Sequence, residues 1–299
     1  MRVVVTGGTG FLGTALVGTL TARGDEVAVL TRRSRGGSRA REVEWVPGGS
    51  TAGWAPALEG ADAVVHLAGE SLDAHRWSPA QKAAIVESRV VATRTIVTGI
   101  ERAANPPRLL VSASAVGYYG PRGDEVITEE EPPGRDFLAR LCVDWERDAR
   151  RAEAAGVRVV TLRSGLILAR EGGALPRMLL PFRLGLGGPL GTGRQFWPWI
   201  HRDDWVSLVS LLLSHPAASG PFNVTAPTPV TNREFTRTLG RVLRRPAVLP
   251  VPGFALRVVL GEMAGVVLTG QRAVPARALA LGYSFQHEAL EPALRSLLG

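Results

Sequence analysis

Residues 6–13 decide the fold, and they are Thr6-Gly7-Gly8-Thr9-Gly10-Phe11-Leu12-Gly13. The apolar run Arg2–Thr6, which precedes them, predicts a strand, and Phe11–Arg23 predicts a helix. The four glycines of this stretch match both common spacings of a dinucleotide-binding turn, Gly8-x-Gly10-x-x-Gly13 and Gly7-x-x-Gly10-x-x-Gly13. In such a turn the first glycine permits a tight bend, the second lets backbone N–H groups approach a pyrophosphate, and the third lets the helix pack close to the strand. The chain therefore begins with a predicted dinucleotide site.

The same strand–helix alternation continues through the first half of the chain. Further strands are expected over Glu26–Thr31, Val43–Val46, Ala63–Leu67, Leu109–Ser114 and Val157–Ser164. Two more helices are expected over Pro79–Ala103 and Phe137–Ala155. The strands are near-continuous runs of Val, Leu and Ile, as in strands covered on both faces. This order predicts an α/β fold, a Rossmann-like doubly wound parallel sheet.

After Gly165 the chain is interrupted more often by glycine and proline. A helix is expected over Asp203–Leu213, a short strand over Phe222–Thr225 and a helix over Thr231–Leu243, with short helices from Pro250 onward. We predict a nucleotide-binding domain of residues 1–170, to which 203–226 returns. Residues 171–202 and 227–299 are predicted to form a smaller α/β substrate lobe over the carboxyl edge of the sheet, where such folds bind ligands.

The end of the second predicted strand indicates the type of cofactor. A site for NAD would place an acidic residue there to hold the ribose 2′-hydroxyl, but the chain has Arg32 and Arg33. Arginine suits a 2′-phosphate because its guanidinium makes forked, charged hydrogen bonds. NADP is therefore the predicted cofactor. A solvated basic loop is the alternative, since Arg35, Arg39 and Arg41 follow.

Composition excludes several classes of protein. The 299 residues include 35 Lys+Arg and 27 Asp+Glu, and Lys82 is the only lysine. The net charge of +8 invites a nucleic-acid partner, but the sequence shows neither a basic helix nor an aromatic RNA-binding platform, so none is expected. No segment is predicted to span or bind a membrane. The single cysteine, Cys142, fits a reducing cytoplasm. No His/Cys cluster has metal-ligand spacing, so no metal is expected.

Several motifs resemble the extended short-chain dehydrogenase/reductase superfamily, and within it the atypical epimerase family. The residues that carry the resemblance are Gly7–Gly13, Leu67-Ala68-Gly69-Glu70, Arg76-Trp77, Ser112–Gly120, Phe137-Leu138-Ala139, Cys142, Trp145-Glu146, Leu162–Gly165 and Ile200–Asp204. The resemblance covers the whole chain, and the tail from about Arg244 is similar to a small C-terminal domain peculiar to this family. Bacterial members are labelled nucleoside-diphosphate-sugar epimerases or cell-division inhibitors.

The resemblance also shows what this chain lacks. The superfamily uses a Ser, and a Tyr four residues before a Lys on one helix. Aligned on Trp145-Glu146, those helix positions hold Leu138 and Cys142, so the dyad is absent and only the serine, Ser114, remains. In nucleotide-sugar epimerases an arginine four residues before the histidine of the Ile-His-x-Asp motif binds the diphosphate. Trp197 stands at that position, which favours a more apolar or planar substrate.

The candidate catalytic residues are therefore Ser114, Tyr118 and Tyr119, with an arginine expected to lower a tyrosine pKa. The candidate cofactor-binding residues are Gly7, Gly10, Phe11, Leu12, Gly13, Arg32, Arg33, Leu67, Ala68, Gly69, Glu70, Arg89 and Ser112.

Each of the other polar candidates has a structural alternative. Glu70 is either a pocket carboxylate or a partner of nearby backbone, and Arg89 either contacts the site or is a helix-surface charge. Cys142 is expected to be a buried apolar residue rather than a thiolate. Asp203 is expected to cap the helix that follows it, and His201 to pack beneath the lobe junction.

Two functions stay open from the sequence. The first is an NADP(H)-dependent reductase or epimerase acting on an unidentified small substrate. The second is an NADP(H)-binding regulatory protein without turnover, linked to cell division by the label that some family members carry. A homodimer through the long helices is expected by analogy with the superfamily.

Overall fold

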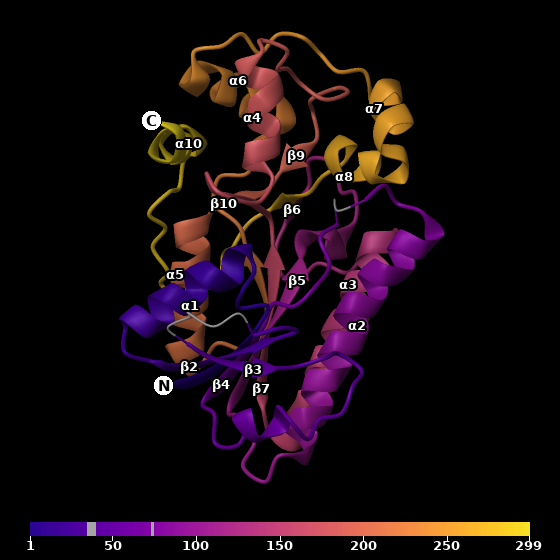
Figure 1. Ribbon diagram of the computed structural model, residues 1–299. Coiled ribbons are helices and arrows are strands. Elements are labelled where there is room, and N and C mark those ends of the chain that lie inside the picture. The colour runs from indigo at the N-terminus through magenta and orange to yellow at the C-terminus, as the bar shows by residue number, and fades with distance from the viewer. Residues whose placement is uncertain (35–39, 73–74) are drawn as a thin grey trace.

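The computed structural model describes residues 1–34, 40–72 and 75–299. Its centre is a seven-stranded parallel sheet with the order β11-β7-β5-β4-β1-β2-β3 (Figure 1). The strands are β1 (Arg2–Thr6), β2 (Glu26–Thr31), β3 (Arg41–Glu44), β4 (Ala63–His66), β5 (Leu109–Ala115), β7 (Arg158–Ser164) and β11 (Gly220–Val224). The order runs outward from β1 in both directions, which is the doubly wound topology. The predicted α/β class is confirmed.

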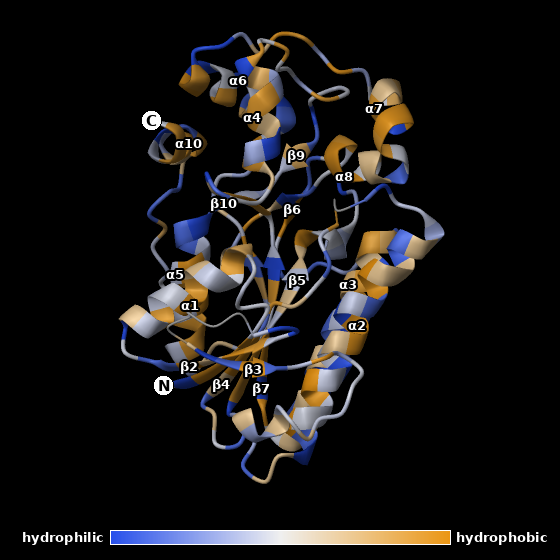
Figure 2. Ribbon diagram, viewed as in Figure 1, coloured by the Kyte–Doolittle hydropathy of each residue, from blue (hydrophilic) through white to orange (hydrophobic). Residues whose placement is uncertain are grey.

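Helices cover both faces of this sheet. The helices α1 (Phe11–Ala22) and α5 (Arg202–Ser214) lie on one face, and α2 (Pro79–Arg102) and α3 (Phe137–Arg150) lie on the other (Figure 1). Successive side chains of a strand point to opposite faces. Val3 and Val5 accordingly belong to one core cluster with Leu208 of α5, while Val4 belongs to a second cluster with Ile96 of α2. This two-sided burial explains the unbroken valine runs, which appear as hydrophobic strands in Figure 2.

Several element boundaries differ from the expectation, and β3 and α3 are two examples. Strand β3 pairs with β2 two residues earlier than predicted, beginning at Arg41. Helix α3 ends at Arg150 and continues as the 3-10 turn Arg151–Ala155. The last turn tightens before Gly156, which adopts the left-handed conformation that closes helices.

The prediction that Asp203 caps α5 is wrong. His201, not Asp203, caps α5, because its Nδ1 accepts a hydrogen bond from the Asp203 backbone N at 3.1 Å. The extended backbone of His201 lets the ring turn back toward the first turn of the helix. The Asp203 carboxylate lies half exposed and pairs with Arg202 instead. The imidazole ring of His201 stacks on that of His287 at a centroid distance of 3.8 Å.

An upper lobe lies over the carboxyl edge of the sheet (Figure 1). Its helices are α4 (Leu175–Arg183), α6 (Asn232–Leu243), α7 (Gly253–Leu260), α8 (Ala264–Leu268) and α10 (Leu290–Leu298), whereas α9 (Ala276–Ala280) packs against β11 of the central sheet. Its short strands pair as β8 (Leu166–Leu168) with β10 (Trp199–His201), β9 (Phe196–Trp197) with β12 (Val230–Thr231), and β6 (Val126–Ile127) with β13 (Arg272–Ala273). Trp197 and Trp199 are buried in the core of this lobe, where Trp197 packs edge-on against Phe235. In the described ranges, no helix has the length and apolar character needed to cross a bilayer.

A buried histidine connects the sheet to α2. Nδ1 of His66 lies 2.7 Å from Thr6 Oγ1, and Nε2 lies 3.1 Å from Thr93 Oγ1. Thr93 donates its own proton to the Arg89 carbonyl, so it accepts from Nε2. Nδ1 therefore accepts from Thr6, and the ring is neutral with one defined tautomer. Burial lowers the pKa of His66 from 6.5 to about 4.

We expect acid to destabilise the fold through His66. Between pH 6.5 and 4 the unfolded chain binds a proton here that the folded chain does not, so stability falls as pH falls. The shift corresponds to a loss of about 3 kcal/mol across that window. Urea unfolding at pH 7.5 and 4.5 measures it. His66→Asn should remove the loss, whereas the exposed His75→Asn should retain it; equal pH profiles for both variants would contradict the assignment.

Candidate functional site

The glycine turn between β1 and α1 has the geometry that the sequence predicts. Gly7 has φ +68°, a conformation that costs little without a Cβ, and its carbonyl accepts a hydrogen bond from Gly10 N at 2.9 Å. A Cβ on Gly13 would lie 2.1 Å from the Gly7 carbonyl oxygen. Helix α1 can therefore approach β1 this closely only with glycine at position 13. Its first N–H groups point to the carboxyl edge, where a pyrophosphate is held in this kind of turn.

The segment after β4 lies directly against this turn. Thr6 Oγ1 accepts hydrogen bonds from the backbone N of Leu67 at 3.2 Å and of Ala68 at 3.3 Å. A Cβ on Gly7 would come within 2.9 Å of the Leu67 backbone. The hydroxyl of Thr6 thus fixes residues 67 and 68 beside the glycines. Ser112, one strand further, is buried in β5 in register with His66.

The side chain of Phe11 supports a second segment above the turn. A Cβ on Gly172 would lie 2.3 Å from the Phe11 ring, and one on Gly173 would lie 3.3 Å from it. The loop between β8 and α4 therefore crosses the start of α1 in van der Waals contact. Leu12 points the other way and packs against the core cluster under α1. The sequence indicated residues 172 and 173 only as a chain break, because nothing local shows which ring they must accommodate.

Arg32 and Arg33 follow β2, which pairs with β1, so they lie at the same edge as the glycine turn. Both side chains are exposed. Neither guanidinium makes an ion pair or side-chain hydrogen bond with any residue that the structure describes. Arg35 and Arg39, which belong to the alternative of a solvated basic loop, lie outside the described residues. Both arginines are free to contact a ligand bound at the turn.

A buried ion pair stands beside the carboxyl end of β5. Arg163 at the end of β7 makes a two-pronged contact with Glu146 of α3, with Nε to Oε1 and Nη2 to Oε2 both at 2.9 Å. Both side chains are 4% exposed. Ser114 donates its hydroxyl proton to Glu146 Oε1 at 2.7 Å. The pair fixes the direction of the Ser114 proton, so the Ser114 oxygen presents its lone pairs to anything bound nearby.

The two tyrosines after β5 have different surroundings. Tyr119 is fully buried, and its hydroxyl donates to Asn223 Oδ1 at 2.7 Å and accepts from Arg163 Nη1 at 3.0 Å. The ring of Tyr118 is partly exposed and stacks on the Arg163 guanidinium, 3.5 Å from its carbon to the ring centre. Among the described residues, the Tyr118 hydroxyl has no hydrogen-bond partner.

The expected lowering of the tyrosine pKa is wrong for Tyr119. Burial raises its pKa to about 12, and this outweighs the opposing effect of the Arg163 charge. The reason is that the buried phenol is removed from water, which penalises its charged form, and the nearby charge of Glu129 raises the pKa further. Tyr119 therefore serves as a packing residue whose hydroxyl is fully used, the alternative that its sequence position left open. The roles of Ser114 and Tyr118 in catalysis stay predictions.

Arg89 is not a helix-surface charge. It lies between α2 and α3 with its guanidinium 5.3 Å from the ring centre of Trp145, and it donates to the Ile85 carbonyl at 3.3 Å. Its carbon atoms lie against Gly69. Burial lowers the Arg89 pKa, which the negative charge of Glu70 partly opposes. Ser88 Oγ accepts from the Glu70 backbone N at 3.0 Å, so the segment after β4 is held to α2.

The positions of the missing dyad have no replacement acid or base. Cys142 is fully buried, and burial and the charge of Glu146 raise its pKa to about 12. Its thiol faces the Ala115 carbonyl at 3.8 Å. Leu138 packs beside Gly117. Lys82 is far from these positions in sequence and pairs with Glu262 of the upper lobe. Cys142 is thus a neutral thiol in the core.

Glu129, Asn223 and Arg277, which sequence reasoning did not single out, complete the cluster around Tyr119 and Arg163. Glu129 is buried and accepts from the backbone N of Asn223 at 3.0 Å and of Arg277 at 3.2 Å. The Asn223 amide donates to the Val274 carbonyl. Burial raises the Glu129 pKa. They connect β11 and the C-terminal segment to Tyr119 and Arg163. No local signal marks them, because their partners are 50 to 150 residues away in the chain.

Comparison with known proteins places this geometry in a family. Residues 3–225 match the model of the NAD dependent epimerase/dehydratase family. The chain belongs to that family. Residues 251–297 match a further domain, described as a domain of unknown function, DUF1731. The predicted resemblance is thereby confirmed, including its distinct C-terminal segment.

This member of the epimerase family has relatives along its whole length. It is 43% identical to the chloroplastic SDR39U1 homolog of Arabidopsis thaliana over 100% of this chain and 87% of that protein. It is 40% identical to the epimerase family protein YfhF of Bacillus subtilis, over 100% and 98% of the two chains. A crystal structure of human SDR39U1 with NADPH superposes with a TM-score of 0.90 at 38% identity, covering 100% of this chain and 99% of that one.

Proposed function

We propose that this protein is an NADP(H)-dependent oxidoreductase or epimerase-type enzyme that acts on a small substrate at the carboxyl edge of its sheet. One observation carries the proposal: a glycine turn with no room for a Cβ at positions 7 and 13 lies at the same sheet edge as two exposed arginines, which make no ion pair with the described residues. The human relative whose structure contains NADPH supports the choice of nucleotide.

The residues at the turn fit a dinucleotide. The N–H groups at the start of α1 would hold the pyrophosphate, and Arg32 and Arg33 would hold the 2′-phosphate. Residues 67–70 would line the side of the nucleotide opposite α1. NADP(H), when bound, supplies or accepts a hydride at its nicotinamide ring.

Proton handling in the proposed reaction falls to Ser114 and Tyr118. The Ser114 hydroxyl donates its hydrogen bond to Glu146, so its oxygen is left to accept a hydrogen bond from a substrate hydroxyl and to orient that hydroxyl. Tyr118 has a partly exposed ring and a hydroxyl outside the described hydrogen bonds, so it is the phenol available to donate a proton. Arg163 lies under its ring and would stabilise negative charge that develops on it.

Cofactor preference tests the first part of the proposal. The thermal unfolding midpoint should rise more with NADPH than with NADH, because only NADPH offers a second phosphate to the arginines. The double variant Arg32→Ala/Arg33→Ala should lose that difference and keep a response to NADH. An equal rise with both nucleotides in the unaltered protein would contradict the NADP assignment.

The absent dyad favours a second candidate, an NADP(H)-binding regulatory protein without turnover. Leu138 and the neutral thiol of Cys142 occupy the positions of the usual acid/base pair. The two functions separate in one assay. NADPH absorbance at 340 nm is followed while a panel of carbonyl compounds is added to the pure protein. If the protein is an enzyme, at least one compound should cause NADPH to be consumed, and Tyr118→Phe should slow that consumption without changing NADPH binding. If it is a regulator, no compound should cause NADPH to be consumed.

A further inference from the structure

One cavity lies away from the nucleotide edge, on the outer side of the upper lobe. It has a volume of about 650 Å³, within the range of small-molecule sites. Helix α6 forms its floor, and residues 244–248 fold back along that helix to form a wall. The fold-back is tight, because a Cβ on Gly240 would lie 2.6 Å from Ala247 Cβ. The cavity is therefore built into the backbone path.

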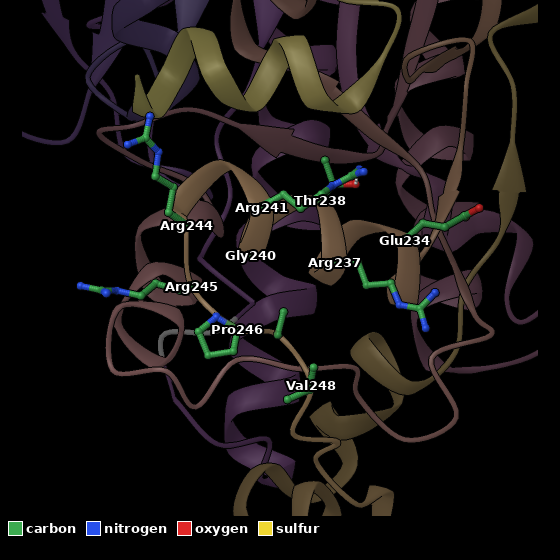
Figure 3. A pocket seen from close by; sticks show the side chains of 10 residues that line it. Glu234, Arg237, Thr238, Gly240, Arg241, Arg244, Arg245, Pro246 and Val248 are labelled. Carbon is green, nitrogen blue, oxygen red and sulfur yellow. Dashed lines mark hydrogen bonds between the residues drawn. The ribbon is translucent and has the colours of Figure 1, made fainter.

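Four arginines line this cavity: Arg237, Arg241, Arg244 and Arg245. Arg241 is neutralised by Glu291 of α10 at 3.1 Å. The other three guanidinium groups make no ion pair or hydrogen bond with any residue in the described part of the chain. The one acidic residue of the lining, Glu234, is engaged in the cap of α6 through Thr231. Three arginines without a counter-charge in the described part of the chain thus line one cavity, and their guanidinium groups extend outward around its rim (Figure 3).

The backbone of Arg244 gives an independent indication. Arg244 has φ 53°, and among the described residues it is the one non-glycine residue with positive φ. It ends α6 with the bonds of a Schellman motif, from Arg244 N to the Arg241 carbonyl and from Arg245 N to the Gly240 carbonyl. Glycine normally occupies this position because an L side chain is strained there. Strained backbone clusters at functional sites, so this position supports a binding role for the end of α6.

The upper lobe that contains this cavity carries an excess of positive charge. Residues 175–199 and 229–260, which carry α4, α6 and α7, contain nine arginines and one glutamate. The rest of the chain has 26 basic and 26 acidic residues, so these two segments account for the entire net charge of +8. Such a field attracts anions to this lobe.

From this cavity we propose a second ligand site, which binds a small anion carrying two or more phosphoryl groups. Figure 3 shows Arg244 and Arg245 at one end of the groove and Arg237 at the other, with Pro246 and Val248 between them. Separated charges suit an extended oligophosphate better than a single phosphate. The hollow shape of the site favours a small molecule over a flat membrane or a duplex.

Calorimetric titration with inorganic tripolyphosphate tests the site. The unaltered protein should bind it, and Arg237→Ala and Arg245→Ala should each weaken binding by about tenfold, as expected for a charged contact to phosphate. Arg244→Gly should weaken binding similarly and raise the thermal midpoint by about 2 °C, because it removes backbone strain. Arg102→Ala, at the exposed end of α2, removes the same charge and should change neither value.

Three outcomes would overturn the proposal. One is a loss of affinity in Arg102→Ala equal to that in the cavity variants, which would mean that overall charge alone attracts the anion. Another is no affinity loss in Arg237→Ala and Arg245→Ala, even if Arg244→Gly fails to fold. The third is tighter, arginine-dependent binding of vesicles containing phosphatidylglycerol or of an oligonucleotide, which would identify a macromolecular surface. Retained tripolyphosphate binding in Arg32→Ala/Arg33→Ala separates this site from the proposed nucleotide site.

Discussion

Replacing Gly13 by alanine should abolish most nucleotide binding. The new Cβ would lie 2.1 Å from the Gly7 carbonyl oxygen and 2.6 Å from Gly8 Cα, and neither backbone atom can yield without moving the turn. We expect the free energy of unfolding to fall by about 1–3 kcal/mol, as in other overpacked sites. The Kd for NADPH should rise roughly a hundredfold, about 3 kcal/mol. Urea unfolding and a fluorescence titration of NADPH measure the two effects.

Gly18 provides the matched control on the same helix. It lies in α1, and a Cβ there would meet no atom within 4 Å. Gly18→Ala should stabilise the protein by up to about 1 kcal/mol through helix propensity and leave NADPH affinity unchanged. Normal affinity in Gly13→Ala would show that the close approach of α1 to β1 does not form the nucleotide site.

Glu146→Gln should be among the most destabilising single substitutions in the chain. It leaves the Arg163 guanidinium, 4% exposed, without a carboxylate. A buried arginine that loses its counter-charge costs about 3–5 kcal/mol. Ser114 and Tyr119 share this pair, so their positions should change as well. Urea unfolding measures the loss.

The same substitution at an exposed pair is the control. Glu101 binds Arg151 at 3.2 Å with side chains 31% and 47% exposed. Glu101→Gln should cost less than about 1 kcal/mol, since solvent screens the pair. If both substitutions cost the same, Arg163 must reach water or another anion when Glu146 is absent, and the buried pair would not organise the site.

The sequence predicts well those features that depend on local pattern. The valine runs, the glycines of the turn and the helix that follows it depend on neighbouring residues. The sheet and the glycine turn therefore follow from Thr6–Gly13 and from periodicity. The burial of Cys142 also follows, since a lone cysteine in an apolar helix face is usually a core residue. The cap of α5 does not follow, because His201 and Asp203 are both plausible caps until the backbone of residue 201 is known.

The electrostatics of the site depends on contacts between distant residues. The sequence indicated an arginine near Tyr119, but the sign of the Tyr119 pKa shift depends on the burial of the phenol, which outweighs the Arg163 charge. Glu146 is 32 residues from Ser114, and Asn223 is 104 residues from Tyr119. Composition cannot reveal which of 27 acidic residues is buried. Such contacts become visible only when the strands are ordered in the sheet.

The hydrogen bonds of two buried carboxylates bear on how this chain can evolve. The Glu129 carboxylate accepts a hydrogen bond from the backbone N of Arg277. The Asp204 carboxylate, fully buried in α5, accepts hydrogen bonds from the backbone N of Gln286 at 2.7 Å and of His287 at 2.9 Å. The acceptors lie in the segment that matches one family model, and the donors lie in the segment that matches the other. Exchanging the C-terminal segment for an unrelated one would remove the backbone donors of buried Asp204 and leave Glu129 with Asn223 N alone. A substitute segment would therefore have to supply N–H groups at the same two places for the first segment to stay folded.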